Sequence, residues 1–305
     1  MIDILVDAAA ALLLPWLMLG AIAKVKAKWA GRKGAPVLQP LYDALKELRK
    51  SQVMSRTATM LFALAPVVSL VAVVFAALLV PGPTGRAIVS FPGDFVLFAY
   101  LLALARFLSV VAALDTGSSF EGMGASREAF FSALVEPGLF LVLASTLLAS
   151  GTTTLSRIAL GIHSGTAVAD VMLLLAALGL FLMVLVEGHR LPVDDPATHL
   201  ELTMVHEVMV LDNSGPDLAM IGYASALRIY LFSSIAAALA VPPDVPPLVH
   251  AGGVVLVLFV FSIAVGLLES WSARIRLTHV PQLLFVVNIC GMLLFFLALL
   301  GGGQG

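Results

Sequence analysis

Residues 57–80 read TATMLFALAPVVSLVAVVFAALLV, a stretch without a single charged side chain. A helix needs about 20 mostly apolar residues to cross the hydrocarbon core of a bilayer, and it satisfies its backbone polar groups internally. This stretch meets that length, so it predicts a membrane-spanning helix.

Seven more windows share this character, and together they predict an all-α polytopic membrane protein, one membrane domain over residues 1–305. The eight expected helices cover residues 4–23, 57–80, 92–114, 129–150, 167–187, 216–240, 249–269 and 279–300. The first ends in Ala21-Ile22-Ala23, which resembles a signal-peptidase site. Because its beginning carries Asp3 and Asp7 and no basic residue, we expect it to be retained as a helix.

The composition excludes several classes of protein. Of the 305 residues, 60% are apolar and only 12% are charged, unlike a soluble domain. The formal net charge of −2 gives no basic excess for nucleic acid. Cys290, the only cysteine, cannot hold an iron–sulfur cluster, and the histidines lack metal-binding spacing. We therefore expect this chain to bind no metal and no cofactor.

The distribution of lysine and arginine predicts the orientation. Loop 24–56 holds nine of the 17 basic residues, and its side of the membrane holds 13 against two on the other side. Basic loops stay in the cytoplasm. We expect both termini to face outward from the cytoplasmic (inner) membrane, with loops 1, 3 and 5 cytoplasmic. These loops, 24–56, 115–128 and 188–215, are longer than a connection requires.

Loop 1 contains glycines and prolines that argue against regular structure up to Pro40. An amphipathic turn is expected after it, with Leu41, Leu45 and Leu48 on one stripe. The loop is either a docking surface for a cytoplasmic partner or a basic segment at the lipid headgroups that only fixes topology.

Loop 3 contains glycines that permit tight turns, and Ser126 is expected to cap the next helix. In that helix Glu128, Ser132 and Glu136 share one side. Pro137, which follows, is expected to open the helix hydrogen-bond ladder. Burying an ionised carboxylate in a membrane is costly, so we expect Glu136 to be functional and Glu128 to lie in the headgroup zone.

Loop 5 is acidic. Residues 187–217 hold seven acidic side chains against Arg190. Asp195 before Pro196 predicts the start of a short helix. The stripe expected on it consists of His199, Thr203 and His206, with Glu207 at its edge. Crowded carboxylates raise one another's pKa, which suits proton relay. Two alternatives are a metal site formed by His199, His206 and Glu207 and an acidic loop that is only solvated.

Among the charged residues in the predicted helices or at their ends, four need an explanation: Arg106, Arg228, Glu187 and Glu269. The two acids end helices on the cytoplasmic side, where they could reach the headgroups. The two arginines lie deeper, where a charge costs about 2.5–3.5 kcal/mol. We expect each arginine to pair with a carboxylate or to face a wet cavity.

Three motifs in order resemble one family over essentially the whole chain. The run GRKGAPVLQPLYDALKELRK at 31–50 resembles the first cytoplasmic loop of the complex I membrane subunit called subunit 1, or the H-type subunit in bacteria. The runs LDTGSSFEGMGASRE at 114–128 and EGHRLPVDDPATHLELTMVHE at 187–207 resemble the variant found in formate hydrogenlyase and related membrane-bound NiFe hydrogenases.

The resemblance implies a non-redox membrane anchor and coupling subunit. Its expected partners are hydrogenase-like and iron–sulfur peripheral subunits, which would carry the iron–sulfur clusters and a NiFe centre, and antiporter-like membrane subunits. The docking-loop candidates are Arg32, Gly34, Gln39, Pro40, Tyr42, Asp43 and Lys46. The proton-path candidates are Glu121, Glu128, Glu136, Glu187, Asp194, Asp195, Glu201 and Glu207, with the helix-end acids Asp115 and Glu269 added. The expected charge partners are Arg106, Arg190 and Arg228.

Loop 5 departs from the quinone-using members, which usually carry a Pro-Phe-Asp-Leu-x-Glu stretch where this chain has Pro192-Val193-Asp194-Asp195. That favours the hydrogenase-type group over a quinone-chamber subunit of an NADH:quinone dehydrogenase. A stand-alone secondary transporter is another alternative, against which the lack of an inverted repeat counts. A purely structural anchor is the third.

Overall fold

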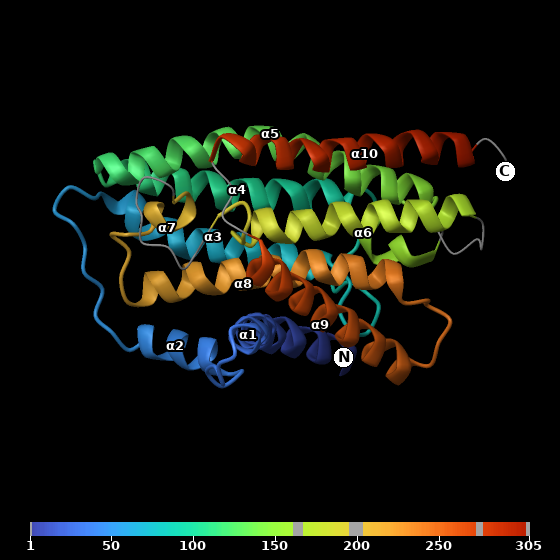
Figure 1. The fold of residues 1–305 in the computed structure, drawn as a ribbon, viewed down its shortest axis with the longest axis horizontal. Coiled ribbons are helices and arrows are strands. Elements are labelled where there is room, and N and C mark those ends of the chain that lie inside the picture. The colour runs from blue at the N-terminus through green and yellow to red at the C-terminus, as the bar shows by residue number, and fades with distance from the viewer. Residues whose placement is uncertain (1, 161–166, 195–203, 273–276, 303–305) are drawn as a thin grey trace.

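The fold is helical throughout the residues that the computed structural model describes, which are 2–160, 167–194, 204–272 and 277–302, and these contain no strand. The helices are α1 (Ile2–Trp29), α2 (Gln39–Glu47), α3 (Met60–Leu79), α4 (Asp94–Asp115), α5 (Ser119–Ala149), α6 (Ala167–Glu187), α7 (His206–Met209), α8 (Pro216–Ala240), α9 (Pro247–Trp271) and α10 (Val280–Gly302), with the short 3₁₀ turns η1 (Leu155–Leu160) and η2 (Leu277–His279) (Figure 1).

Eight helices are long and apolar enough to cross a membrane: α1, α3, α4, α5, α6, α8, α9 and α10. They confirm the eight predicted spans. The first extends beyond its predicted end at residue 23 to Trp29 and so includes Lys24, Lys26 and Lys28. Lysine is a good helix former, so the helix continues past the apolar window.

Helix α8 occupies the centre of the bundle. It packs against α1, α3, α6 and α9, and its segment 224–239 is buried almost throughout. Much of that segment is alanine and serine, small residues that let helices approach closely. Helices α5 and α10 lie along each other at one edge of the bundle, and α1 and α9 lie at the opposite edge (Figure 1).

Helix α5 begins ten residues before the predicted 129, so loop 3 is only the short connection 116–118. The expectation of a long loop was wrong, because Gly122 and Gly124, two of the glycines that suggested turns, lie inside α5. Gly124 lets α5 pack closely against α7, since a Cβ there would lie 2.3 Å from Cγ1 of Val208. Ser126 is not a cap either. Its hydroxyl donates to the carbonyl of Met123 at 2.8 Å, inside the helix.

Helix α5 also continues through Pro137, so the expected opening of the ladder does not end or divide it. A proline lacks only its own N–H. Nearby, the Nδ2 of Asn288 in α10 donates to the carbonyl of Leu134 at 2.9 Å. Hydrogen bonds from a neighbouring helix can satisfy the backbone around a proline in a membrane helix.

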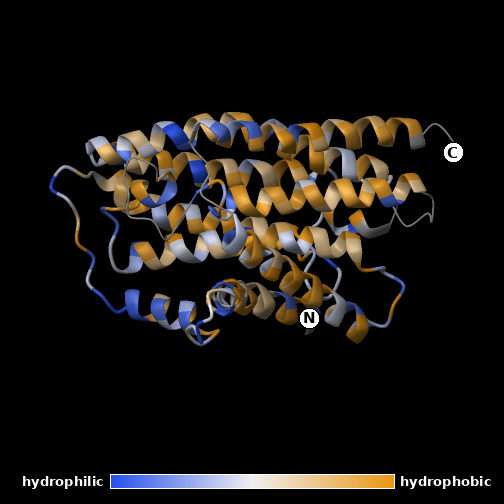
Figure 2. Ribbon diagram, in the orientation of Figure 1, coloured by the Kyte–Doolittle hydropathy of each residue, from blue (hydrophilic) through white to orange (hydrophobic). Residues whose placement is uncertain are grey.

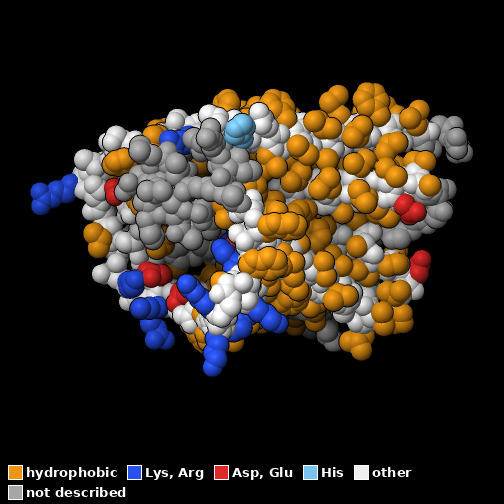
Figure 3. Space-filling model, in the orientation of Figure 1, with side chains coloured by type: hydrophobic (Ala, Val, Ile, Leu, Met, Phe, Trp, Pro, Cys, Tyr) orange, Lys and Arg blue, Asp and Glu red, His pale blue; other side chains and the backbone are white. Residues whose placement is uncertain are grey.

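Helix α2 lies at the edge of the bundle, where it contacts α1 and α8, and it has no buried residue (Figure 1). It starts at Gln39, so Pro40 stands in its first turn instead of preceding it, a position that proline favours. Hydrophilic residues gather at the end of the molecule that holds α2 and α7, and most of the remaining length is hydrophobic (Figure 2). On one face, lysine and arginine side chains cluster near α2 and its connection to α1 (Figure 3).

Candidate functional site

Arg106 of α4 is the centre of a buried cluster of charges. Its side chain is 7% exposed, and each guanidinium nitrogen contacts a different carboxylate. Nε lies 3.3 Å from Oε1 of Glu128, Nη1 lies 3.1 Å from Oε1 of Glu136, and Nη2 contacts Oε1 of Glu187. The planar guanidinium presents its donors in a fixed fork. It therefore joins α4 to α5 and α6 at one point.

The sequence spacing on α5 produces two of these contacts. Glu128 and Glu136 lie two helical turns apart and so share a face, with Ser132 between them donating its hydroxyl to the carbonyl of Glu128. The expectation that Glu128 lies in the headgroup zone was wrong: α5 begins earlier, and its carboxylate is only 11% exposed. Glu136 differs, since its side chain is 41% exposed and reaches the surface of the bundle.

Two small cavities touch Arg106. One of about 10 Å³ is lined by Glu128, His189 and Asp194, among others. The other, of about 30 Å³, is lined by Glu136 and Glu187. A water molecule needs about 10–15 Å³ and several polar partners. Each cavity therefore has room for about one water beside a carboxylate.

The end of α6 places Glu187 and His189 side by side in the cluster. Arg190 N–H donates to the carbonyl of Leu185 at 2.8 Å, and His189 N–H to that of Val186 at 3.2 Å, the pattern of a Schellman motif. His189 takes the left-handed position that glycine usually fills, with φ +51°. Such backbone strain costs about 1–3 kcal/mol and is concentrated at functional sites.

His189 and His206 form a buried pair. Their rings stack with centroids 3.7 Å apart and planes 7° apart, and Nη1 of Arg228 lies 3.2 Å from Nε2 of His189. Burial, then the charge of Arg228, lowers the pKa of His206 to about 3. Burial, then the neighbouring His206 and Arg228, lowers the pKa of His189 well below its usual range. Both rings are therefore neutral, and Nε2 of His189 accepts from the guanidinium.

Arg228 thus has an imidazole as its hydrogen-bond partner, where a carboxylate or a wet cavity was expected. His189 is a site residue that the sequence patterns did not single out, although the run Glu187-Gly188-His189-Arg190 ends a helix. A histidine directly after a buried carboxylate at a helix end is the signal that could have found it.

Asp194 holds the returning part of loop 5 against the cluster. Its Oδ2 accepts from the N–H of His206 at 2.7 Å, and its Oδ1 from that of Val205 at 3.3 Å. These contacts cap the first turn of α7. Arg127 of α5 adds a bond from Nη1 to the carbonyl of Met204 at 2.9 Å. Asp195, Glu201 and the predicted helix with His199 and Thr203 lie outside the described residues.

Glu269 forms a second buried charge cluster. Its side chain is 0% exposed and lies 2.7 Å from Nζ of Lys26 in α1 and 3.6 Å from Nη1 of Arg190. The expectation that Glu187 and Glu269 could reach the headgroups was wrong, since both carboxylates are held inside by cations from other segments. This second cluster joins α9 to α1 and to loop 5.

The other acidic candidates lie elsewhere. Oδ2 of Asp115 accepts from the N–H of Thr59 at 2.7 Å and so fastens the start of α3. Oε1 of the buried Glu121 accepts from the N–H of Asp212 at 3.1 Å. Each carboxylate therefore accepts a hydrogen bond from a backbone N–H of another segment. Glu207 lies half-buried on α7.

The docking-loop candidates all lie on the surface, exposed or partly exposed: Arg32, Gly34, Gln39, Pro40, Tyr42, Asp43 and Lys46. The loop has a defined shape, since Nζ of Lys24 donates to the carbonyl of Lys33 at 2.7 Å. Gly34 has φ +66°, and a Cβ there would lie 2.4 Å from Cβ of Ala27. In the apolar stripe of α2, Leu45 and Leu48 are 45% and 51% exposed, and Leu41 is partly exposed.

Metal ligation finds no support in this part of the molecule. Over the described ranges, no three His, Cys, Asp or Glu side chains gather so as to hold a metal ion. His199, needed for the metal alternative, lies outside those ranges, and the ring of His206 is stacked on His189.

Comparison with known proteins agrees with the motifs. A model of the NADH dehydrogenase family matches residues 2–300. The chain belongs to this family. This family member is 29% identical over 274 residues to formate hydrogenlyase subunit 4 of Escherichia coli K12, covering 87% of this chain and 88% of that protein. It is 29% identical over 238 residues to hydrogenase-4 component C of the same strain, covering 78% and 74%.

A more distant relative is the H-type subunit of the NADH-quinone oxidoreductase of Rickettsia typhi, 29% identical over 173 residues, which cover 56% of this chain and 51% of that one. The fold is similar to a chain of the membrane-bound sulfane sulfur reductase, described as an archaeal respiratory membrane complex, with TM-score 0.79, 20% identity and coverage of 97% and 98%. This family member is therefore a multi-pass membrane protein similar to membrane subunits of such complexes.

Proposed function

We propose that this member of the NADH dehydrogenase family is the membrane anchor and coupling subunit of a complex I-like, hydrogenase-type respiratory oxidoreductase. The chain carries no electrons itself. It docks a peripheral arm of hydrogenase-like and iron–sulfur subunits, and it links their electron transfer to proton (or sodium) movement into antiporter-like membrane subunits. Similarity to subunits of formate hydrogenlyase and hydrogenase-4 supports this class of complex.

The placement in the membrane follows from the basic residues. Loop 24–56 carries nine of them, and basic loops remain cytoplasmic. The Arg106 cluster, α2 and loop 5 then lie toward the cytoplasm, and both termini face outward from the inner membrane. The exposed docking-loop side chains and the exposed Leu45 and Leu48 at the end of α2 support docking of the peripheral arm on this side.

One observation carries the coupling role: three carboxylates share the guanidinium of Arg106, and one of them reaches the bundle surface. Glu136 lies in the middle of α5 with its side chain 41% exposed. A carboxylate facing lipid at that depth is costly. The face that presents Glu136 therefore adjoins a polar protein surface, which suits an antiporter-like membrane subunit.

The contacts suggest the order of the proton path. Asp194 and Glu128 line the first small cavity, Glu187 and Glu136 line the second, and Arg106 lies between the two. A water molecule in each cavity would bridge carboxylates that are too far apart to transfer a proton directly. Because the carboxylates outnumber the guanidinium, uptake of one proton brings the cluster closer to charge balance. An electron arriving in the docked arm adds negative charge nearby and favours that uptake.

The test replaces Glu136 by glutamine in the intact complex. Hydrogen evolution from an artificial reductant should continue, whereas proton movement per hydrogen evolved in closed membrane vesicles should fall at least about tenfold, because a positioned proton-transfer group typically contributes 10²–10⁴-fold. Glu136→Asp should restore part of the coupling. Asp170→Asn, which removes an exposed carboxylate at the end of α6 opposite Glu187, should keep it. Normal coupling in Glu136→Gln, with all subunits present, would refute the path.

The two alternatives predict different purification results. A quinone-chamber subunit should bring bound quinone, and a stand-alone transporter should leave mild detergent without partners. The proposed subunit should instead bring iron–sulfur partners with nickel and iron. Purification of the native complex, followed by identification of its subunits and by analysis of metals and quinone, distinguishes the three.

A further inference from the structure

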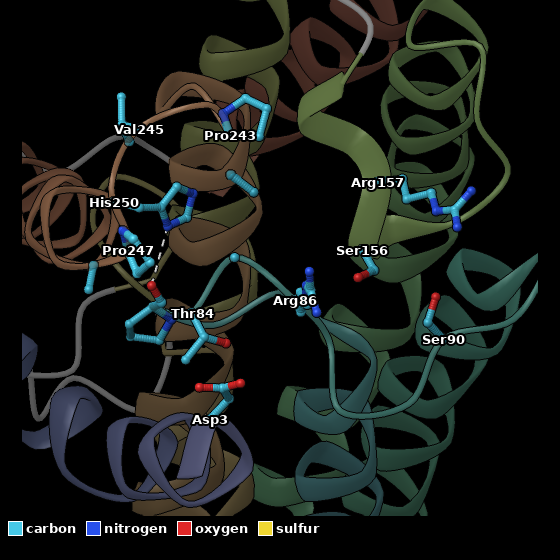
Figure 4. Close-up of a pocket in the computed structure, with 14 residues that line it drawn as sticks. Asp3, Thr84, Arg86, Ser90, Ser156, Arg157, Pro243, Val245, Pro247 and His250 are labelled. Carbon is cyan, nitrogen blue, oxygen red and sulfur yellow. Dashed lines mark hydrogen bonds between the residues drawn. The ribbon is translucent and has the colours of Figure 1, made fainter. Parts of the chain in front are cut away.

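The end of the bundle away from Arg106 contains a polar cavity of about 750 Å³ (Figure 4). It lies where α1 and α9 begin, between the α3–α4 loop, η1 and the α8–α9 loop. Its polar lining includes Asp3, Thr84, Arg86, Ser156, Arg157 and His250. This volume is within the usual range for a small-molecule site, about 300–1,000 Å³. The proposed coupling role does not use this cavity.

Two arginines from separate segments line this cavity. Arg86 belongs to the α3–α4 loop and Arg157 to η1. The N–H of Ala87 donates to Oγ of Ser156 at 3.1 Å, which fastens the loop to η1 directly beside both arginines. Both side chains are exposed, and no ion pair or side-chain hydrogen bond holds either guanidinium among the residues that the structure covers.

Two acids in the segments around the cavity, Asp7 and Asp94, accept hydrogen bonds from backbone N–H groups. Oδ1 of Asp7 accepts from the N–H of Thr84 at 3.1 Å, and Oδ1 of Asp94 from that of Leu155 at 2.9 Å. Among the described residues that line the cavity, Asp3 is the acidic one. In Figure 4 it lies near Thr84, while Arg86 and Arg157 are on the side of Ser156. The two arginines against Asp3 give the lining an excess of positive charge.

His250 forms a preformed wall. It is 7% exposed, and its Nδ1 donates to the carbonyl of Pro83 at 3.3 Å. In the neutral ring with the proton on Nδ1, Nε2, which has no hydrogen bond in the described part of the chain, is the acceptor. Gly85 has φ +77°, and a Cβ there would lie 2.8 Å from the Cε1 of His250. Only glycine lets the loop pack this closely against the ring.

Apolar side chains project next to the polar lining. Ile4 and Leu5 follow Asp3 on α1 and are 51% and 64% exposed, and Leu248 and Val249 precede His250 on α9 and are 86% and 59% exposed. A ligand bound here therefore meets cations and a hydrogen-bond acceptor in the cavity and apolar surface beside it. The cavity also lies at the ends of spanning helices, the depth of lipid headgroups.

We propose that this cavity binds an anionic glycerophospholipid with a hydroxyl-bearing headgroup, of the phosphatidylglycerol class. The guanidinium groups of Arg86 and Arg157 bind the phosphate diester, since arginine presents paired donors that match phosphate oxygens. Nε2 of His250 accepts from a headgroup hydroxyl. The acyl chains lie along the exposed apolar side chains of α1 and α9.

The test measures lipid retained by the intact complex. The complex is purified in mild detergent, incubated with phosphatidylglycerol, phosphatidylethanolamine or phosphatidylcholine of equal chain length, and analysed by native mass spectrometry. Wild type should retain phosphatidylglycerol most tightly. Arg86→Gln with Arg157→Gln should weaken retention about tenfold or more, the loss expected for charge-assisted hydrogen bonds. Arg49→Gln with Arg56→Gln, two exposed arginines near the opposite end, should have no effect.

Several results would overturn the proposal. These are equal or tighter retention of either zwitterionic lipid, an unaffected double glutamine variant, or displacement of the lipid by millimolar inorganic phosphate, which would indicate a site for a free anion. Cross-linking of the cavity to another subunit in the native complex would also overturn it. If the glutamine variant does not assemble, the test uses Arg86→Lys with Arg157→Lys. Lysine keeps the positive charge but lacks the paired donors of arginine. The lysine variant should therefore retain less lipid than wild type.

Discussion

The contact between Arg106 and Glu187 makes a quantitative prediction about stability. Their side chains are 7% and 1% exposed, so solvent screens the pair little. Arg106→Gln removes the guanidinium from three carboxylates and should cost about 3–5 kcal/mol of unfolding free energy, the loss typical of a broken buried ion pair. Glu187→Gln replaces a charge-assisted hydrogen bond by a neutral one and should cost about 1–2 kcal/mol. Because the double variant loses the shared contact only once, its cost should be smaller than the sum by about 1–3 kcal/mol.

The chain contains its own probe for this measurement. Cys290, the only cysteine, is 4% exposed in α10, so a thiol-reactive fluorophore should label it only on unfolding. The four chains of the cycle are purified in detergent, and labelling is followed across a denaturant series. Additivity of the two single costs to within about 0.5 kcal/mol would refute an energetic link between Arg106 and Glu187. A matched cycle of Arg49 with Glu187, residues at separate places in the fold, should be additive.

Three more outcomes are expected in the same labelling assay or by purification. Burial and a neighbouring arginine lower the pKa of His206 from 6.5 to about 3, so the unfolded chain binds a proton below pH 6.5 that the folded chain does not bind. The contribution of His206 to the free energy of unfolding is full above pH 6.5 and falls by about 1.4 kcal/mol per pH unit below it. His206→Phe, which keeps a ring against His189, should remove this part of the slope and leave the part that comes from His189, whose pKa burial also lowers. A Cβ at Gly124 would lie 2.3 Å from a side chain of α7, so Gly124→Ala should lower the free energy of unfolding by about 1–3 kcal/mol. At Gly122 the nearest neighbour of a Cβ is 4.0 Å away, so Gly122→Ala should leave the free energy of unfolding unchanged or raise it by up to about 1 kcal/mol. Equal effects of the two substitutions would contradict the close packing of α5 against α7. Arg32→Glu with Lys46→Glu reverses two exposed charges of the docking loop. The double variant should lose the iron–sulfur partners during purification, while the membrane subunits stay together. Unchanged recovery of the iron–sulfur partners would argue against docking at this loop.

The eight spans were predictable because length and hydropathy alone determine which segments can cross a bilayer. The start of α5 was not predictable in this way. Glycines at 122 and 124 indicate turns when only the chain is considered, yet the second of them allows α5 to touch α7, a segment far along the sequence. A glycine required for close approach and a glycine required for a turn look the same until the partner is known.

The site shows a similar limit. The sequence marked Arg106 and Glu136 as charges that need an explanation, since an unpaired charge in a membrane is costly. It could not show that one guanidinium serves three carboxylates, because pairing across helices depends on their rotation and depth. The neutral pair His189 and His206 was hidden for another reason: its meaning comes from ring stacking and burial beside Arg228, which no spacing encodes.

The position of Arg106 makes the same contacts serve both fold and proposed function. Its guanidinium fastens α4 to α5 and α6, so any change in the charge of Glu128, Glu136 or Glu187 also changes what holds these helices together. Asp194 holds the later part of loop 5 near the same region by accepting from the N–H groups of Val205 and His206, and in the proposed function this loop lies on the docking side. In the proposed path, a proton bound at Glu128 would weaken one of the three ion pairs of Arg106 and leave the guanidinium to Glu136 and Glu187. The proposed coupling between the docking side and Glu136 would then act through the shared guanidinium and require no large movement of any helix.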